Sequence, residues 1–434
     1  MPINSVDTVV VIVADSLRRD AEQGAPLPFI RRHAIDFSRA YSPGCWTGAV
    51  YGSLSTGLPP NEHGLDVRWR KLSAEQQTLA EQASAAGWKT TLITANGVPA
   101  IPAWGLRRGF EEVIQAFDRM PWSPIDLLFY ALDWQRVRET IAKRNFIALE
   151  SKANAGKAWL RNTHKDVMIE TLKRQRQSGK RFISINLMET HFPYHISDSL
   201  SFLSEGLGKL DELLALYHLV SETWLHTDHM TISREMLAVL RERARMGFQH
   251  IASAIDAFVE ELMADGKTAV IFLSDHGDAF GEDNKAYHVH NVTVGGNHVP
   301  FYILLPGGRG QIDAGQVNTM DLYGTVLELM GISSNSPSLL GERRSPVTIE
   351  AYYKEVASRN NQEDQFCWHA DDLRLLHRGN RWHQARLVAS GMDEPVWERF
   401  DGDPIEETLS GEDRETMRQR FANYLAYSSQ TSHH

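Results

Sequence analysis

The sequence predicts an α/β fold in which a large mixed, mostly parallel sheet is sandwiched by helices, with a small C-terminal antiparallel subdomain. Apolar, β-branched runs such as residues 9–14 have the composition of strands buried on both faces of a sheet. Stretches with helical spacing alternate with these runs, as in a parallel sheet with crossover helices. Polar residues follow several runs directly, where such folds bind ligands.

The expected elements follow one another in a regular alternation. The first strand is expected at residues 9–14, because this run is continuous, apolar and mostly β-branched. The later elements are a helix at 73–87, strands at 90–94 and 181–187, a helix at 251–263 and a strand at 269–273. Three distant segments could therefore bring their polar ends to one edge of the sheet.

Two segments interrupt this alternation. Residues 115–180 are rich in charge and tryptophan with helical spacing, and residues 196–245 look similar. We interpret both as helical insertions that shape the substrate pocket of a catalytic domain spanning residues 1–340. The composition turns polar from residue 341, with short apolar segments, so residues 341–434 are expected to form the small antiparallel subdomain.

The composition is that of a soluble globular protein with a sizeable core. The chain has 434 residues, of which 42% are hydrophobic and 23% charged. Its net charge of -10 argues against a general nucleic-acid binder or a ligand of anionic membranes. A local basic pocket for an anionic substrate is compatible with that overall charge.

Cysteine usage and the apolar runs indicate the compartment. Cys45 and Cys367 are the only cysteines, so the chain has neither a disulfide framework nor a cysteine-built zinc site. The apolar run near the start and a second run at residues 125–132 are both too short for a membrane span. We therefore expect a cytoplasmic protein.

Three residues at strand exits are candidate metal ligands. Asp15 follows the first strand, and Asp275 and His276 follow the strand at 269–273. Carboxylates and an imidazole on a rigid support are suitable ligands for a divalent ion. Asp15 could instead cap the next helix, and the SDHG turn could be exposed. An exposed turn is the weaker interpretation, because a charged group at a buried strand exit needs a partner.

Thr47 is the candidate nucleophile. It lies in the segment CWTGAVYGSLSTG, directly before a plausible helix. A hydroxyl at the positive end of a helix dipole is well placed to attack, and a bound oxyanion is stabilised there. A threonine that only caps the helix is the alternative. The candidate metal ligands elsewhere in the sequence favour the interpretation of Thr47 as a nucleophile over that of a helix cap.

The segment METHFPYH supplies two further candidates. His191 and His195 are four residues apart and would share one face of a helix, but Pro193 between them favours a loop. We expect His191 to donate to an anion and to act in catalysis. His195 is expected to contact the substrate.

The segment AYHVHNVTVGGNHVP contains three more histidines. If the segment is extended, His288 and His290 lie on one face. We favour His290 as the catalytic residue. His288 and His298 are interpreted as solvated histidines.

Together these pieces resemble the sulfatase branch of the alkaline phosphatase superfamily. The resemblance rests on segments that occur in the family's order over nearly the whole length. They include VVVIVADSLRRD, LSTGLPPNEHGL, GLRRGFEE, METHFPYH, FLSDHGDAFGE, HVPFYILLPGG, MDLYGTVLELMGI and VWERFDGDPIEETL. The resemblance implies an alkaline phosphatase-like sheet between helices and a small C-terminal sheet.

The resemblance also implies roles for single residues. Asp15, Asp275 and His276 match metal ligands of the family, and Thr47 falls at the position of the nucleophile, which also contacts the metal. His191 and His290 resemble positions that bind substrate or a second metal. Arg70 is a further candidate for substrate contact. For Arg70 the alternative is an exposed surface arginine.

Two departures from the family bear on the substrate. Family sulfatases convert a cysteine or serine to formylglycine inside a Cys-x-Pro-x-Arg signature, whereas this chain reads TGAVY, and Cys45 lies two residues too early. Asp15 is followed by Ser16 instead of a second acid, which weakens a calcium site. A threonine nucleophile resembles that of the phosphodiesterases and phosphotransferases of the superfamily. These enzymes use zinc or manganese, so the resemblance implies one or two such ions here.

The predicted function is therefore a metal-dependent hydrolase of phosphate or phosphonate esters that works through a covalent intermediate on Thr47. Its partner would be a small anionic ester, with no nucleic acid and no membrane, and the sequence does not indicate an oligomeric state. The alternatives are a formylglycine-independent sulfatase or sulfamate hydrolase, a phosphoryl-group transferase, and a noncatalytic relative that binds an anion or a protein.

Overall fold

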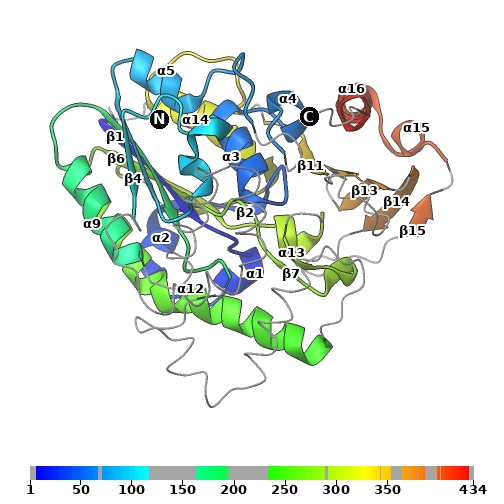
Figure 1. Ribbon diagram of the computed structural model, residues 1–434, viewed down its shortest axis with the longest axis horizontal. Helices are drawn as coiled ribbons and strands as arrows, with labels where there is room; N and C mark the ends of the chain where they lie inside the picture. Colours follow the sequence, from blue (N-terminus) through cyan, green and yellow to red (C-terminus); the bar gives the residue numbers. More distant parts are fainter. Residues whose placement is uncertain are drawn as a thin grey trace, which may run out of the picture.

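The computed structural model (Figure 1) shows an α/β domain in which one sheet lies between two helical layers, and a second, smaller sheet. The structure describes the following residues: 6–66, 71–116, 163–192, 194, 233–288, 292–342, 344–352, 364–370, 372–378, 380–386, 398–400 and 402–429. All structural statements below refer to these residues.

The described residues form an eight-stranded sheet in the order β10-β2-β9-β6-β1-β5-β3-β4. Its strands are β1 (Thr8–Ala14), β2 (Ala34–Tyr41), β3 (Lys89–Thr94), β4 (Glu112–Gln115), β5 (Arg181–Leu187), β6 (Thr268–Leu273), β9 (Phe301–Leu304) and β10 (Gln311–Asn318). Only β9 runs antiparallel to its neighbours, β2 and β6. The predicted mixed, mostly parallel sheet is confirmed.

Strand β1 lies between β5 and β6 and pairs in parallel with both. Val13 is opposite Asn186 of β5 and Leu273 of β6. The three strands therefore end at the same edge of the sheet. Asp15, the segment after β5 and Asp275 are brought together there, as the alternation of elements predicted.

Alternate residues of β1 face opposite helical layers, which explains its continuous apolar sequence. Val9, Val11 and Val13 pack in one core cluster, and Val10 and Ile12 pack in the other. The first layer contains α3 (Thr47–Thr56), α5 (Leu79–Ala85) and α14 (Leu322–Leu329); the second contains α2 (Pro28–His33), α9 (His164–Gln175) and α12 (Arg234–Met263).

Two helices differ in length from the prediction. The helix expected at 73–87 begins only after Thr78, whose side chain forms a capping box with Glu81. The helix expected at 251–263 begins much earlier, at Arg234, after the N-cap Ser233. The C-terminal half of this long helix lies on the sheet, and its N-terminal half continues along the lower edge of the molecule (Figure 1).

The segments predicted as insertions are described only in part. Within residues 115–180, α9 lies against β5 and belongs to the helical layer. Within residues 196–245, the described part is the start of α12. The remainder of both segments lies outside the described residues. No helix in the described part of the chain is both long and apolar enough to cross a membrane.

The C-terminal sheet has five antiparallel strands that follow one another along the chain. They are β11 (Val347–Ala351), β12 (Gln365–Ala370), β13 (Leu373–Arg378), β14 (Arg381–Arg386) and β15 (Glu398–Phe400). Helix α16 (Gly411–Ser428) packs on this sheet through aromatic residues, among them Phe366 and Tyr424. The predicted small antiparallel sheet is confirmed.

Short elements complete the described structure. These are α1 (Arg19–Glu22), α4 (Pro60–His63), η1 (Val98–Ala100), η2 (Pro102–Trp104), β7 (Ala279–Phe280), η4 (Glu282–Asn284), β8 (Ala286–Tyr287), α13 (Val294–Asn297), η5 (Thr319–Asp321) and α15 (Pro404–Thr408). Strands β7 and β8 pair with each other directly after the turn that contains Asp275 and His276.

Candidate active site

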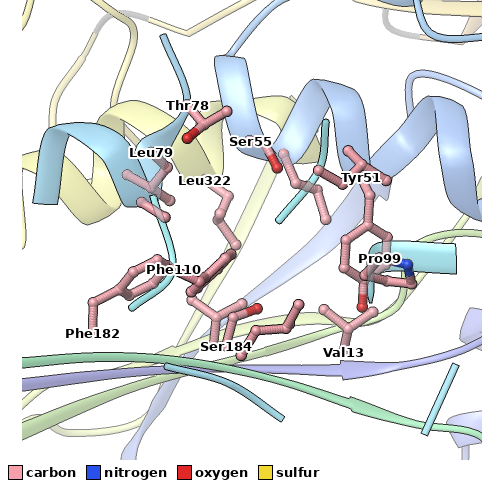
Figure 2. A pocket seen from close by; sticks show the side chains of 15 residues that line it. Val13, Tyr51, Ser55, Thr78, Leu79, Pro99, Phe110, Phe182, Ser184 and Leu322 are labelled. Atoms are coloured by element: carbon pink, nitrogen blue, oxygen red, sulfur yellow. The ribbon is translucent and has the colours of Figure 1, made fainter. Parts of the chain in front are cut away.

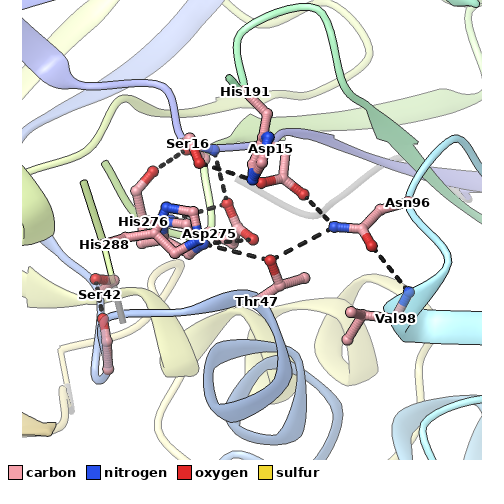
Figure 3. A network of polar contacts seen from close by, with 12 residues as sticks. Asp15, Ser16, Ser42, Thr47, Asn96, Val98, His191, Asp275, His276 and His288 are labelled. Carbon is pink, nitrogen blue, oxygen red and sulfur yellow. Dashed lines mark hydrogen bonds and ion pairs between the residues drawn. The ribbon is translucent and has the colours of Figure 1, made fainter. Parts of the chain in front are cut away.

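Polar side chains from several strand exits meet at one point above the sheet (Figure 3). Asp15, at the tip of β1, is fully buried and accepts hydrogen bonds at Oδ2 from Asn96 Nδ2 (2.7 Å) and Asn186 Nδ2 (3.1 Å). These two amides hold the carboxylate in one orientation. Neither asparagine was among the predicted site residues.

Asp275 presents one carboxylate oxygen that accepts no hydrogen bond from the described residues. Its Oδ1 accepts hydrogen bonds from the backbone N–H of Ser16 (3.1 Å) and of His276 (2.9 Å). Its Oδ2 is buried and has no hydrogen-bond partner. Burial, and next the nearby charge of Asp15, raise the pKa of Asp275 to about 7. A buried, unpaired carboxylate oxygen is costly unless a cation or a proton satisfies it.

His276 is oriented toward the same point. Its Nδ1 lies 3.1 Å from the carbonyl oxygen of Gly277, which can only accept, so Nδ1 carries a proton. Its Nε2 lies 3.3 Å from Thr47 Oγ1 and 3.5 Å from Asp275 Oδ2. Burial lowers the pKa of His276, but the carboxylates of Asp275 and Asp15 outweigh it and the net shift is upward.

Thr47 is the first residue of α3, and its side chain faces this cluster (Figure 3). The residue that caps the helix is Trp46, with extended backbone angles, so the alternative of an N-cap threonine is wrong. Trp46 folds over the start of the helix so closely that a Cβ on Gly48 would lie 2.2 Å from its ring. Gly48 therefore allows the packing that presents Thr47 to the site.

The donor set fits a divalent metal ion. Asp15, Asp275 and His276 each offer a ligand atom, and these atoms lie within 4.8 Å of one another. All three residues are fully buried, and Nδ1 of His276 is fixed by a carbonyl, as is usual for a histidine that ligates a metal through its other nitrogen. Carboxylate oxygen and imidazole nitrogen suit zinc and manganese.

His191 lies beside this cluster in a loop, as Pro193 led us to expect. Its Nδ1 is 2.7 Å from the carbonyl oxygen of Phe192 and so carries a proton, while its Nε2 is 3.1 Å from the hydroxyl of Tyr287. A neutral His191 accepts at Nε2. The expected role as an anion donor therefore requires the protonated ring.

Asp278 and His288 form a second cluster that the prediction missed. His288 Nδ1 lies 2.6 Å from Asp278 Oδ1, and the Tyr194 hydroxyl donates to Asp278 Oδ2 (2.7 Å). The His288 side chain is only 8% exposed, and its ring centroid lies 4.3 Å from that of His276. The interpretation of His288 as solvated is wrong, because Asp278, three residues after Asp275, draws it inward.

Burial, and next the charge of His276, lower the pKa of His288 to about 4. His288 is therefore neutral near pH 7 and donates its Nδ1 proton to Asp278. The carboxylate pKa of Asp278 is lowered: burial opposes this, but the contact with His288 and the nearby histidines outweigh it.

Two described polar residues, Glu189 and His298, lie away from the cluster. Glu189, which flanks His191 in sequence, turns away: its Oε1 accepts from the backbone N–H of Thr163 (2.6 Å) and His164 (2.7 Å) at the start of α9. His298 is buried at 4% exposure, with Nε2 2.9 Å from the carbonyl oxygen of Ser38, so its interpretation as solvated is also wrong. Arg70, His195 and His290 lie outside the described residues.

A small cavity between α3 and the sheet is separate from this site (Figure 2). Its volume is about 30 Å³, enough for roughly one water molecule. Its walls are mainly apolar, with Val13, Phe110, Phe182 and Leu322 among them, and none of the clustered acids or histidines contributes. We regard it as a packing void of the core.

The fold and the site define a class: an alkaline phosphatase-like domain with a buried acid–histidine cluster facing a helix N-terminus. The model of the family described as Sulfatase matches residues 7–332 of the chain. The chain therefore belongs to the sulfatase family, and the predicted resemblance to the sulfatase-like branch of the superfamily is confirmed.

Sequence similarity to curated relatives is local. The chain is 32% identical to arylsulfatase K of Danio rerio over 96 residues, which is 20% of this chain and 18% of that protein. It is 29% identical to arylsulfatase K of Gallus gallus over 125 residues, 27% of this chain and 23% of that protein. The matches thus span about a fifth of the length of these relatives.

Similarity to solved structures extends over whole domains. A phosphonate monoester hydrolase of Agrobacterium radiobacter has a TM-score of 0.64 at 15% identity, covering 97% of this chain and 95% of that chain. A phosphonate monoester hydrolase from Silicibacter pomeroyi has a TM-score of 0.59 at 14% identity, covering 98% and 96%. At these identities the comparison establishes the fold. The family and its neighbours support an ester hydrolase without deciding between phosphorus and sulfur.

Proposed function

We propose that the protein is a metal-dependent hydrolase in which Thr47 attacks the phosphorus of a phosphate or phosphonate ester. The observation that carries the proposal is the position of the Thr47 hydroxyl, 3.3 Å from His276 Nε2 and beside the unpaired Oδ2 of Asp275. A hydroxyl that only supported the fold would not need to face a buried group of two acids and an imidazole.

Asp15, Asp275 and His276 would hold the ion, which we expect to be zinc or manganese. When bound, a divalent ion there lowers the pKa of the Thr47 hydroxyl and offsets negative charge on the ester. The neighbouring N–H groups at the first turn of α3 have no partners within the helix and favour an anion at the same place. Asn96 Nδ2, 3.5 Å from Thr47 Oγ1, adds a neutral donor.

The reaction would proceed in two displacements at phosphorus. In the first, Thr47 Oγ1 loses its proton to solvent and bonds to phosphorus, while the bond from phosphorus to the leaving oxygen breaks and that oxygen takes up a proton. In the second, water attacks phosphorus, the bond to Thr47 breaks, and Oγ1 regains its proton. Protonated His191, beside the cluster, is the proposed donor to the anionic oxygens.

Threonine favours phosphorus for a chemical reason. Formylglycine as a hydrate carries two hydroxyls on one carbon, so its ester can be released by expulsion from that carbon. Thr47 has a single hydroxyl, and its ester must be cleaved by attack at the central atom. The TGAVY window lacks the proline and arginine of the formylglycine signature. Hydrolysis at phosphorus therefore needs no modification of this chain.

A sulfate ester is the second candidate. It is favoured by the local similarity to arylsulfatase K. Hydrolysis of a sulfamate would follow related chemistry. A phosphoryl-group transferase would share the first displacement, but an acceptor other than water would attack phosphorus in the second.

The test is a hydrolysis screen of the chelated protein after reloading with zinc, manganese, magnesium or calcium. The substrates are p-nitrophenyl phosphate, bis-p-nitrophenyl phosphate, a phenylphosphonate ester and p-nitrophenyl sulfate, each assayed with Thr47→Ala as the matched control. Thr47-dependent turnover of a phosphorus ester supports the proposal. Thr47-dependent turnover of the sulfate alone supports the second candidate. No turnover with any ion and ester would point to an enzyme of narrow specificity or to a noncatalytic binding protein.

A further inference from the structure

We propose that the C-terminal sheet positions the active site by holding residues 281–288, called the site loop below. The inference rests on the proposed function, because its consequence is an effect on turnover. The site loop follows β7, contains η4 and β8, and carries Tyr287 and His288, which contact His191 and Asp278.

The site loop contains two residues in a backbone region that side chains disfavour. Asp283 has φ 47° and Tyr287 has φ 68°, and neither is glycine. Such conformations persist where surrounding contacts over-determine them. Tyr287 is directly followed by His288, so the backbone of this residue decides where the imidazole lies.

The C-terminal sheet supplies contacts at both sides of the loop. Arg378 Nη1 of β13 lies 2.5 Å from Asp283 Oδ2, with the two side chains 29% and 18% exposed. Arg374, on the same strand and fully buried, donates from Nη2 to the carbonyl oxygen of Val292, beyond the loop. Residues four apart on a strand lie on one face, so Arg378 contacts the site loop and Arg374 contacts the chain beyond it from the same face of a strand that is paired on both sides.

The same sheet also contacts the segment that leads to the nucleophile. The backbone N–H of Glu350 in β11 donates to the carbonyl oxygen of Pro43 (3.0 Å), and Gly44 forms a parallel bridge with Glu350. A small apolar cluster joins Cys45, Val292 and Cys367 across the junction. The C-terminal sheet thus contacts both the segment before Thr47 and the segment before His288.

The competing explanation is that the main domain fixes the site loop alone. Arg18 Nη1 does lie 2.8 Å from Glu282 Oε1, and the backbone N–H of Gly281 donates to the carbonyl oxygen of Lys285 (2.8 Å). These contacts hold the start of the loop, and the pairing of β8 with β7 places Tyr287 opposite Ala279. The Arg378–Asp283 pair tests the contribution of the sheet separately, because it touches neither the candidate metal ligands nor Thr47.

The experiment is a double-mutant cycle of Arg378→Gln and Asp283→Asn in the metal-loaded chain, assayed on the ester that the wild type turns over best. Asparagine keeps the tolerance for positive φ and removes the charge. Each single variant should lower kcat by about fivefold with little change in KM, and the double variant should be no worse than the poorer single variant. Arg378→Lys should restore part of the loss.

Arg386→Gln is the matched control, since this arginine forms an exposed pair with Asp372 on the same sheet. It should leave kcat unchanged. Hydrogen exchange of the site loop should rise in Arg378→Gln and stay unchanged in Arg386→Gln, a readout that needs no turnover. Wild-type kcat and loop exchange in Arg378→Gln would overturn the inference. A wild-type protein without any esterase activity would instead contradict the proposed function. The hydrogen-exchange data would still show whether the C-terminal sheet holds the site loop.

Discussion

Two acid–histidine clusters lie side by side in this protein and share the ring of His276, yet their carboxylates differ in how they are hydrogen-bonded. In the first, Asp15 and Asp275 present their carboxylates to His276, and one oxygen of Asp275 has no hydrogen-bond partner. In the second, both oxygens of Asp278 are satisfied, one by His288 and one by the Tyr194 hydroxyl.

The difference shows that residue types alone do not define a metal site. Both clusters contain acids and histidines with ligand atoms within 4.8 Å. Of these two clusters of described residues, only the first has a buried carboxylate oxygen without a hydrogen bond, and its ring nitrogen His276 Nε2 faces Thr47. We therefore propose that an ion binds at the first cluster and that the second is a support that orients His288 beside it.

The largest expected effect comes from Thr47. Thr47→Ala should lower kcat by about 10³-fold or more, because the nucleophile is lost. Thr47→Ser keeps the hydroxyl and should retain activity within about tenfold of the wild type. Steady-state kinetics of folded, metal-loaded variants measures both, and undiminished turnover by Thr47→Ala would remove this residue from the mechanism.

The next effect separates the two clusters by metal affinity. Asp275→Asn should weaken binding of zinc or manganese by about 100-fold or more, whereas Asp278→Asn, which alters only the support, should weaken it by about tenfold or less. Isothermal titration of the chelated protein measures both affinities and should give one ion per chain. Two ions per chain, or equal losses in the two variants, would show that both clusters bind metal.

A smaller effect is the pH dependence of stability in the ion-free protein, which should have opposite signs for the two acids. The pKa of Asp275 is raised to about 7, so its contribution to stability is present below the ordinary value of 3.8 and is lost as pH rises toward 7. The pKa of Asp278 is lowered, so its contribution is present above 3.8 and is lost as pH falls through its folded value.

Thermal unfolding of the chelated protein checks these signs. Asp275→Asn should raise Tm more at pH 8 than at pH 5, because it removes a buried charge that no ion offsets. Asp278→Asn should lower Tm at pH 8. Equal responses of the two variants at both pH values would contradict the distinction between the clusters.

The smallest effect concerns Tyr194. Tyr194→Phe removes the hydroxyl that donates to Asp278 and should cost about 1–2 kcal/mol of unfolding free energy, since a buried carboxylate oxygen loses its donor. Metal affinity should be unchanged. Chemical denaturation and metal titration of the same variant check both statements, and a large loss of metal affinity would mean that Asp278 is itself a ligand.

Sequence patterns predicted the sheet and the first cluster because both depend on local features. The apolar runs specify buried strands, and parallel strands that end at one edge bring Asp15 and Asp275 together without knowledge of the loops. The Trp46–Gly48 contact, which presents Thr47, could not be predicted, because it depends on a ring folding over a helix start.

The second cluster was missed for a related reason. His288 and His290 have the same parity in an extended segment, and periodicity cannot choose between them. The inward position of His288 depends on the positive φ of Tyr287 and on Asp278, whose position follows from the turn after β6. Asn96 and Asn186 also lie at strand ends, which is a signal that could have found them.

The most direct test of the central claim is to trap the intermediate. The metal-loaded protein is mixed with a phosphorus ester that it turns over, quenched in acid within one turnover, and digested for mass spectrometry. The account predicts a phosphoryl or phosphonyl group on Thr47, absent in Thr47→Ala. Turnover with an unmodified Thr47 peptide, together with activity in Thr47→Ala, would contradict it.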